Sequence, residues 1–480
     1  MRVRRAVWIL ALACLAAAPP DGIDPGPRVN REVARARRHV PQIGVHVLEV
    51  ASGREVYSFR ADRSMVPASN QKLLTTAAAL DRLGAGFLFT TTLDLRGEVD
   101  IGGALHGDLA VQGTGDPTIS GRFENGDPYG LFRRWARDLR RRGIRRITGS
   151  LYLDHELYDD ERFHPAWPED QQMWWYGAPV DALSFNDNCQ LLRVWGGARP
   201  GRPAVVDLIP RVELLDVRNG LVTVPRRDAH RWRVHRNPGS TVLELDGRVL
   251  DRGPPREVWV TVENPVLYFG RALRSALGEE GIDLQGEIRP VEGLPGSDWT
   301  RVRVHQRPLI DILDVANKRS QNLYAESLFK RLGAELCHRG SWRAGARAVE
   351  GFLTDRMSWS MEEIRISDGS GLSRENRIAP RQLTELLRSM FLHPAGLEFV
   401  RSLPFSGEEE GSLRDRLENP PYRANVFAKT GTLRGVSALS GFAKGRSGRI
   451  YAFSILTNRG PVWRARSGQD EIVKALIDHG

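Results

Sequence analysis

Cysteine and lysine are both scarce in this chain of 480 residues, which has 3 Cys and 6 Lys. Cys189 and Cys337 lie far apart and have no CxxC partner or neighbouring His cluster, a pattern that argues against a cysteine-based metal site. His155-Glu156 begins like a HExxH zinc motif, but Asp159 occupies the place of the second histidine. We therefore expect no metal centre and no cofactor.

Arginine supplies nearly all of the positive charge. The formal net charge is +10, with 63 Arg and 6 Lys against 59 acidic residues. Apart from a cluster at 140–146 the arginines are scattered, whereas a nucleic-acid-binding surface would concentrate them in a patch or stripe. We expect no nucleic-acid partner. An anionic polymer of the cell envelope is compatible with this charge, and solubility alone explains it equally well.

Long apolar runs are absent except near the N-terminus. Residues 1–5 carry three arginines, residues 6–18 are apolar and two prolines follow, which is the anatomy of a secretory signal peptide cleaved after Ala18. The run of 13 residues is too short to span a bilayer comfortably. Cys14 raises a lipoprotein alternative, but Ala11 stands where a lipidation box usually has Leu. We expect an exported protein of the periplasm or cell envelope, with no integral membrane span after cleavage.

One stretch sets a candidate nucleophile beside a candidate base. Ser69 and Lys72 lie three positions apart at the start of a run with helical apolar spacing, which predicts a buried helix from about 69 to 83. Residues three apart share a helix face, so the Lys72 amine can reach the Ser69 hydroxyl. Burial and the helix dipole both favour the neutral amine that a base requires. Alone, the pattern is weak, because a serine N-cap followed by a surface lysine is commoner.

Two later motifs favour the catalytic interpretation of Ser69 and Lys72 over the N-cap interpretation. Ser320-Gln321-Asn322 lies within the predicted helical stretch 309–330, and Lys429-Thr430-Gly431-Thr432 ends the strand-like residues 426–428. Taken singly, Ser320 and Asn322 would be ordinary polar groups flanking a helix. The order SxxK, SxN, KTG is far less expected by chance than any one motif.

The hydrophobic pattern changes along the chain and divides it into regions. Residues 40–59 alternate as a β-hairpin, and from about 91 to 258 short strands and glycine turns dominate, with one helical patch at 131–142. Periodic helices return from 264, and the apolar segments 438–443 and 450–456 indicate adjacent antiparallel strands. The predicted organisation is a signal peptide at 1–18, a discontinuous catalytic domain at 19–92 and 259–480, and a β-rich module inserted at 93–258, as one piece or as two subdomains.

The three motifs together resemble the active-site serine penicillin-recognising enzymes. The separation of 251 residues between Ser69 and Ser320 leaves room for the inserted module, which compact serine β-lactamases lack. This arrangement is similar to that of the D-alanyl-D-alanine carboxypeptidase/endopeptidases, the class C low-molecular-mass penicillin-binding proteins of peptidase family S13. Further stretches similar to that family lie at 107–109, 113–117, 176–180, 368–373 and 432–435.

The resemblance implies an α+β fold, an α/β sandwich of the penicillin-binding-protein and serine β-lactamase-like transpeptidase type. Its antiparallel sheet would be flanked by helices, with the β-rich module inserted. The resemblance also implies that Ser69 is the nucleophile, Lys72 the general base and Ser320 a proton relay to the leaving amine. The implied substrate-binding residues are Asn322, Lys429, Thr430, Gly431 and Thr432.

The expected function is that of a serine-type DD-carboxypeptidase, with DD-endopeptidase activity as an extension. It would hydrolyse D-alanyl-D-alanine bonds of peptidoglycan stem peptides through an acyl-enzyme on Ser69, and β-lactam antibiotics would act as acylating inhibitors. The backbone N–H groups of Ser69 and Thr432 would stabilise the oxyanion. A β-lactamase and a catalytically silent cell-wall-binding scaffold are the alternatives. One departure from the family is the stretch 404–413, where Glu408-Glu409-Glu410 makes the loop more acidic.

Overall fold

The computed structural model describes residues 24–226 and 229–480 of the chain. The signal peptide predicted at 1–18, and with it Cys14, lies outside these residues. Contacts divide the chain into two compact units, one that ends at Phe87 and resumes over Pro308–Gly480, and one formed by Leu88–Arg307. Every helix in the described ranges is too short or too polar to cross a membrane.

The first unit is built on a five-stranded antiparallel sheet. In spatial order its strands are β16 (Val426–Leu433), β17 (Val436–Lys444), β18 (Ile450–Asn458), β1 (Gln42–Glu49) and β2 (Glu55–Phe59). The β1–β2 hairpin predicted at 40–59 and the antiparallel pair predicted at 438–443 and 450–456 are confirmed. The central strand β18 is buried at all but its last position, as expected for a strand covered on both faces.

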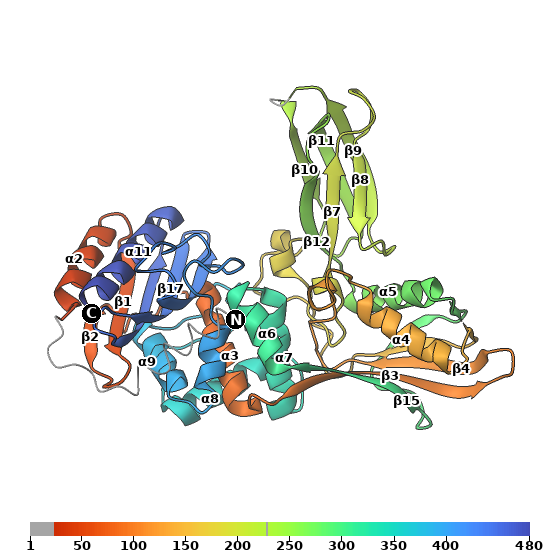
Figure 1. The fold of residues 1–480 in the computed structure, drawn as a ribbon, viewed down its shortest axis with the longest axis horizontal. Helices are drawn as coiled ribbons and strands as arrows, with labels where there is room; N and C mark the ends of the chain where they lie inside the picture. Colours follow the sequence, from red (N-terminus) through yellow and green to blue (C-terminus); the bar gives the residue numbers. More distant parts are fainter. Residues whose placement is uncertain (1–23, 227–228) are drawn as a thin grey trace. The chain divides into compact units, whose positions relative to one another are not determined.

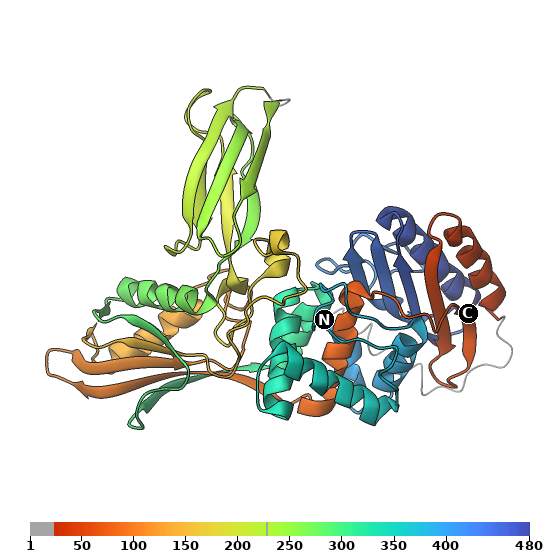
Figure 2. The same ribbon diagram turned by 180° about the vertical axis from the view of Figure 1, so that it is seen from behind.

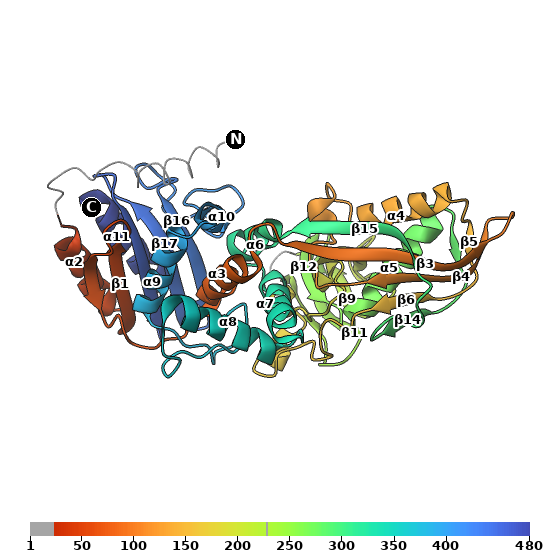
Figure 3. The ribbon, with the colours of Figure 1, turned by 90° about the horizontal axis from the view of Figure 1, so that it is seen from below.

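Helices cover both faces of this sheet (Figures 1 and 3). The helices of the unit are α2 (Gly26–Arg37), α3 (Gln71–Leu83), α6 (Leu309–Lys318), α7 (Asn322–Cys337), α8 (Trp342–Met357), α9 (Pro380–Phe391), α10 (Gly396–Ser402) and α11 (Val462–His479). Helices α2 and α11 pack together and share an apolar core with the sheet. Helix α9 lies against β1 and β18 so closely that a Cβ on Gly44 would come within 2.9 Å of the Pro380 ring. The predicted α+β class is confirmed.

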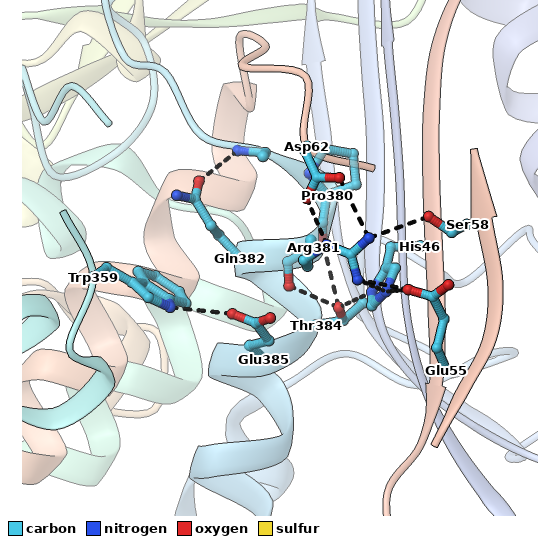
Figure 4. A network of polar contacts seen from close by, with 11 residues as sticks. His46, Glu55, Ser58, Asp62, Trp359, Pro380, Arg381, Gln382, Thr384 and Glu385 are labelled. Carbon is cyan, nitrogen blue, oxygen red and sulfur yellow. Dashed lines mark hydrogen bonds and ion pairs between the residues drawn. The ribbon is translucent and has the colours of Figure 1, made fainter. Parts of the chain in front are cut away.

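A polar network fixes α9 to the hairpin (Figure 4). Arg381 donates to Glu55 Oε2 at 2.6 Å and to Asp62 Oδ1 at 2.5 Å. The buried His46 ring contacts Glu55 Oε2 through Nε2 at 3.0 Å and the Thr384 hydroxyl through Nδ1. Each charge in this network has a partner of opposite sign, so the network holds the helix against the sheet.

The helix predicted over 309–330 is wrong in one respect, because it is interrupted at Ser320. Helix α6 ends at Lys318, Ser320 has φ = 57°, and α7 begins at Asn322. A left-handed conformation is costly for a residue with a Cβ, by about 1–3 kcal/mol, and such strain concentrates at functional sites. The turn therefore places Ser320 between two helices rather than on the side of one.

The second correction concerns the KTG motif, which does not end its strand. Strand β16 continues through Lys429 and pairs Thr430 with Leu439 and Thr432 with Ser437. Side chains alternate between the two faces of a strand, so Lys429 and Gly431 belong to one face of β16, and Thr430 and Thr432 belong to the other.

The second unit, seen from behind in Figure 2, contains a larger sheet and two smaller ones. The larger sheet comprises β3 (Leu88–Val99), β4 (Ala104–Gln112), β5 (Arg146–Ile147), β6 (Leu151–Asp154), β13 (Asp283–Leu284), β14 (Ile288–Val291) and β15 (Thr300–Pro308). Helices α4 (Gly130–Arg141) and α5 (Pro265–Glu279) bury their apolar faces in its core, where the Phe132 and Phe269 rings meet edge to face at 4.8 Å.

The two small sheets enclose a separate apolar core. Their strands are β7 (Cys189–Trp195), β8 (Val205–Ile209), β9 (Asp216–Val224), β10 (Arg231–His235), β11 (Val242–Leu250) and β12 (Arg256–Thr261). The second unit extends to Arg307, beyond the end predicted for the inserted module at 258. The reason is that β15 pairs with β3 and the buried face of α5 belongs to the core of the larger sheet.

Candidate active site

Ser69 lies in a short 3-10 turn, Ala68–Asn70, that leads directly into α3. Lys72 follows in the first turn of α3 and is completely buried. Its Nζ lies 3.1 Å from Ser69 Oγ, 2.7 Å from Asn322 Oδ1 and 2.8 Å from the Ser370 carbonyl. A neutral amine has two hydrogens and one lone pair, so it can donate to the amide and carbonyl oxygens and accept the serine proton.

Burial has a large effect on the protonation of Lys72. Desolvation lowers the pKa of Lys72 from 10.5 to about 7, although the negative charges of Glu326 and Asp368 act in the opposite direction. A substantial fraction of the amine is therefore neutral near pH 7. This is the state in which it can remove a proton from Ser69.

The SxN motif contacts two different lysines. Ser320 Oγ accepts from Lys429 Nζ at 2.8 Å, whereas Asn322, two residues on, holds Lys72. The left-handed Ser320 turn makes this division possible, because it separates the two side chains onto different elements.

Lys429 is also completely buried, on β16. Besides Ser320, its Nζ donates to the Thr430 carbonyl at 2.9 Å. Burial, and then repulsion from the charge of Lys72, lowers the pKa of Lys429 well below its ordinary value. Neither Lys72 nor Lys429 forms an ion pair with a carboxylate in the described ranges of the chain.

Gly431 allows β16 to lie against the nucleophile turn. A Cβ at this position would lie 2.9 Å from the Pro67 carbonyl and 3.0 Å from the Ser69 nitrogen. Asn70 strengthens the same junction, since its amide can donate to the Lys429 carbonyl at 2.9 Å and accept from Ser440. The backbone of the KTG strand therefore runs close to the backbone of Ser69.

The two threonines of the motif face polar partners. Thr430 Oγ1 lies 2.8 Å from Ser412 Oγ, and Thr432 Oγ1 accepts from Arg466 at 3.0 Å. The structure thus brings all of the predicted site residues into one contact network within the first unit. These residues are Ser69, Lys72, Ser320, Asn322, Lys429, Thr430, Gly431 and Thr432.

A half-buried serine that shares a hydrogen bond with a completely buried lysine is the arrangement that the motifs predict. Comparison with known proteins shows which family has this arrangement. The model of the D-Ala-D-Ala carboxypeptidase 3 (S13) family matches residues 30–477. The chain belongs to this family.

Individual relatives are also similar to this chain over most of its length. This chain is 32% identical over 456 residues to the D-alanyl-D-alanine carboxypeptidase of Actinomadura sp. (strain R39), covering 91% of this chain and 81% of the relative. It is 26% identical over 434 residues to the D-alanyl-D-alanine carboxypeptidase DacB of Haemophilus influenzae, covering 88% and 87%.

The fold is also similar to solved structures. The crystal structure of penicillin binding protein 4 (dacB) from H. influenzae superimposes with a TM-score of 0.80 at 25% identity, covering 92% of this chain and 97% of that one. Its complex with a β-lactam gives a TM-score of 0.75, with 93% and 99% covered. The likeness to this S13 enzyme includes both units, not only the one that carries the serine.

Glu326 is a residue of the site that the sequence analysis missed. It lies one helical turn after Asn322 on α7 and is completely buried. Its carboxylate accepts from the backbone nitrogens of Gly369 at 3.0 Å and Ser370 at 2.7 Å, and from Trp342 Nε1 at 2.8 Å. Because the Ser370 carbonyl accepts from Lys72, Glu326 positions the segment that orients the base. The sequence feature that could have identified Glu326 is its place, as a charged residue, on the buried face of a predicted helix.

Burial, and then the charge of Asp368, raises the pKa of Glu326 above its ordinary value. Asp368 itself accepts from the backbone nitrogens of Gly371 at 2.7 Å and Ser373 at 2.6 Å, which shapes the loop. Gly371 has φ = 85°, and a Cβ there would lie 1.8 Å from the Ala68 carbonyl. This loop is therefore packed directly against the turn that carries Ser69.

The acidic loop at 404–413, which departs from the family pattern, contacts the residues next to the SxN motif and the strand of the KTG motif. Glu408 forms an ion pair with Lys318 at 3.4 Å, and the Ser412 nitrogen donates to the Lys318 carbonyl at 3.0 Å. Ser412 also meets Thr430, as described above. The loop therefore links the end of α6, next to Ser320, to the KTG strand.

Proposed function

We propose that this S13-family chain is a serine-type DD-carboxypeptidase that hydrolyses the terminal D-alanyl-D-alanine bond of peptidoglycan stem peptides. The observation that carries the proposal is the completely buried Lys72 amine, 3.1 Å from the Ser69 hydroxyl. Ser69 Oγ attacks the carbonyl carbon of the penultimate D-alanine while Lys72 accepts its proton. Collapse of the tetrahedral intermediate expels the terminal D-alanine and leaves an ester on Ser69, which water then hydrolyses.

Proton return and oxyanion stabilisation fall to neighbouring groups. Ser320, bonded to Lys429, passes a proton to the departing amine. The backbone N–H groups of Ser69 and Thr432 face the oxyanion, a role supported by the close approach of Gly431 to the Ser69 nitrogen. Asn322 holds Lys72 and the substrate amide.

The terminal carboxylate of the substrate is bound by Lys429 and Thr430. A carboxylate next to Lys429 favours its ammonium form and so opposes the lowering of its pKa by burial. Thr432 adds a hydroxyl, and Gly431 lets the substrate lie along β16. Both lysines then have distinct tasks, proton transfer for Lys72 and anion binding for Lys429.

β-Lactam antibiotics are proposed to acylate the same serine, because they present a strained amide beside a carboxylate. The peptidoglycan substrate places the mature protein in the periplasm or cell envelope, and a cross-linked peptide is a further substrate of the endopeptidase type. A β-lactamase is disfavoured by the match of both units to carboxypeptidases. A silent scaffold is disfavoured by the complete set of contacts between Ser69, Lys72 and Asn322.

Incubation with intact muropeptides, followed by mass analysis of the products, tests this proposal. Loss of one D-alanine from pentapeptides is the expected result, and conversion of dimers to monomers would add endopeptidase activity. Intact muropeptides after incubation with a protein that is folded would overturn the proposal.

A further inference from the structure

Arg466 is an arginine at the active site to which no role has been assigned. It is exposed on α11, 34 residues along the chain from Thr432, and its guanidinium donates to Thr432 Oγ1 at 3.0 Å. Thr432 belongs to the strand along which the substrate is proposed to lie. Arg466 therefore places a permanent positive charge beside that strand.

A cavity of about 540 Å³ adjoins Arg466 and also Thr430, which lies on the same strand as Thr432. Its volume falls in the usual range for sites that bind small molecules, about 300–1,000 Å³. Its lining has four arginines, three acidic residues and three uncharged residues, namely Arg319, Arg414, Arg416, Arg466, Glu409, Glu410, Asp415, Gly411, Ser412 and Thr430. Through Thr430 this cavity adjoins β16, the strand along which the substrate is proposed to lie.

The other arginines of the cavity already have carboxylate partners. Arg319 pairs with Glu410, Arg414 with Asp415 at 3.0 Å, and Arg416 with Asp470 at 2.6 Å. In the described part of the chain, Arg466 contacts a neutral hydroxyl and forms no ion pair. An anion in the cavity would therefore find in Arg466 a cation that no carboxylate has yet neutralised.

We propose that Arg466, together with the Thr432 hydroxyl, forms a second contact to the free carboxylate that Lys429 and Thr430 are proposed to bind, and that the cavity beside Thr430 receives the leaving residue. The inference rests on the proposed carboxypeptidase reaction and makes it more specific. Lys429 is buried, its hydrogen-bond partners are the Ser320 hydroxyl and the Thr430 carbonyl, and burial lowers its pKa. Arg466 is exposed and forms no ion pair in the described part of the chain, so its positive charge attracts the carboxylate before Lys429 is reached.

The test compares substrates that differ only in this carboxylate. An N-acyl peptide ending in D-alanyl-D-alanine is paired with its C-terminal amide, and benzylpenicillin is paired with its methyl ester. Release of the terminal residue is measured for the peptides, and the rate of Ser69 acylation is measured by intact mass for the penicillins. Wild type, Arg466→Ala, Arg466→Lys and Arg464→Ala are compared.

Arg466→Ala should reduce kcat/KM for both acids by roughly three- to thirtyfold, the range for one charge-assisted contact at a partly solvated site. The loss should appear mainly in KM, and the amide and the ester should change by less than about twofold. Arg466→Lys should recover part of the loss, because lysine restores the charge but not the planar donor pair. Arg464→Ala is the matched control, since Arg464 lies on the same helix and contacts Trp463 and His39.

Equal losses on acid and neutral substrates in Arg466→Ala would overturn the inference, because they would mean that Arg466 only supports β16. So would unchanged rates on both acids. If wild type releases no terminal residue and forms no penicillin adduct, the proposed function fails first. Thermal melting of each variant identifies any loss that comes from unfolding.

Discussion

Two clusters of ionisable side chains lie on the same sheet of the first unit, and they differ in how their charges are compensated. In the network of Figure 4, Arg381 is bonded to two carboxylates, Glu55 and Asp62, and its pKa rises accordingly. The buried His46 ring has Glu55 as a partner, and burial lowers its pKa. This cluster satisfies its charges and fixes a helix in place.

In the described part of the chain, the two lysines around Ser69 form no direct ion pair with a carboxylate. Lys72 and Lys429 are both completely buried, and their hydrogen-bond partners are hydroxyl, amide and carbonyl oxygens. An unpaired buried cation is costly, so the neutral amine is favoured. Paired charges in this fold therefore serve stability, whereas unpaired charges serve chemistry at some expense of stability. Four substitutions probe that difference, in order of decreasing effect.

The largest effect is expected for Ser69→Ala. A fluorescent penicillin should label the purified wild-type protein covalently, because the β-lactam acylates the serine that the base activates. The variant should form no adduct. Intact-mass analysis before and after incubation measures both. An adduct that survives in Ser69→Ala would assign the nucleophile to another residue.

Lys72→Met should reduce the acylation rate by roughly 10²–10⁴-fold, as expected for loss of a general base. It should nevertheless be at least as stable as wild type at pH 7. The pKa of Lys72 is about 7 in the folded protein and 10.5 when exposed, so below pH 7 folding must desolvate a charged amine that the unfolded chain keeps in water. That penalty fades as the pH rises toward 10.5. Acylation kinetics and chemical denaturation at pH 7 and 9 measure the two effects.

A variant that loses activity and also melts well below wild type at pH 7 would place Lys72 among the structural charges instead. Lys72 would then support both activity and stability, contrary to the prediction that it serves activity at the expense of stability.

Glu326→Gln should lower the acylation rate by about tenfold and shift its pH dependence. The carboxylate raises the pKa of Lys72 by its charge, so removing that charge lowers the pKa below about 7. The rise of the rate with pH should therefore occur at a lower pH in the variant. The tenfold loss reflects the Gly369 and Ser370 nitrogens, one of which loses its acceptor to the new amide group.

Trp342→Phe is the matched control for this shift, because it removes one donor to Glu326 but keeps the carboxyl group, whose pKa then rises somewhat further. The rise of its rate with pH should therefore be displaced less than in Glu326→Gln. The same displacement in both variants would mean that packing, not charge, sets the pKa of Lys72.

The features that could be predicted from the sequence are those with local geometry. Ser69 and Lys72 meet because residues three apart share one face of a turn, and the hairpin at 40–59 follows from period-two alternation. The break at Ser320 was not predicted, because no Gly or Pro interrupts the helical pattern there. The length of β16 was underestimated because Thr430 and Gly431 resemble the end of a strand.

Contacts between distant segments lay beyond pattern analysis. Glu326 touches a loop some 43 residues away, and Arg466 reaches Thr432 across 34 residues, so neither role leaves a local signature. The end of the second unit shows the same limitation, because β15 belongs there through its pairing with β3, more than 200 residues earlier in the chain. Periodicity identifies β15 as a strand and cannot identify its partner.

The smallest effect on activity is expected for Arg381→Met, which removes the centre of the paired network. Acylation should remain within about twofold of wild type, since Arg381 contacts none of the residues around Ser69. The free energy of unfolding should fall by about 1–2 kcal/mol at pH 7, the scale of partly exposed charge-assisted contacts. Hydrogen bonds from Arg381 lower the pKa of Glu55 and Asp62 below 4.5 and 3.8. Their contribution is therefore complete above those values and is lost as the pH falls through the lower, folded-state values. The difference in unfolding free energy between wild type and variant, measured by urea denaturation from pH 7 to pH 3, should shrink toward the acid end. A constant difference would show that packing of the Arg381 side chain, rather than its charge, holds α9 to the hairpin.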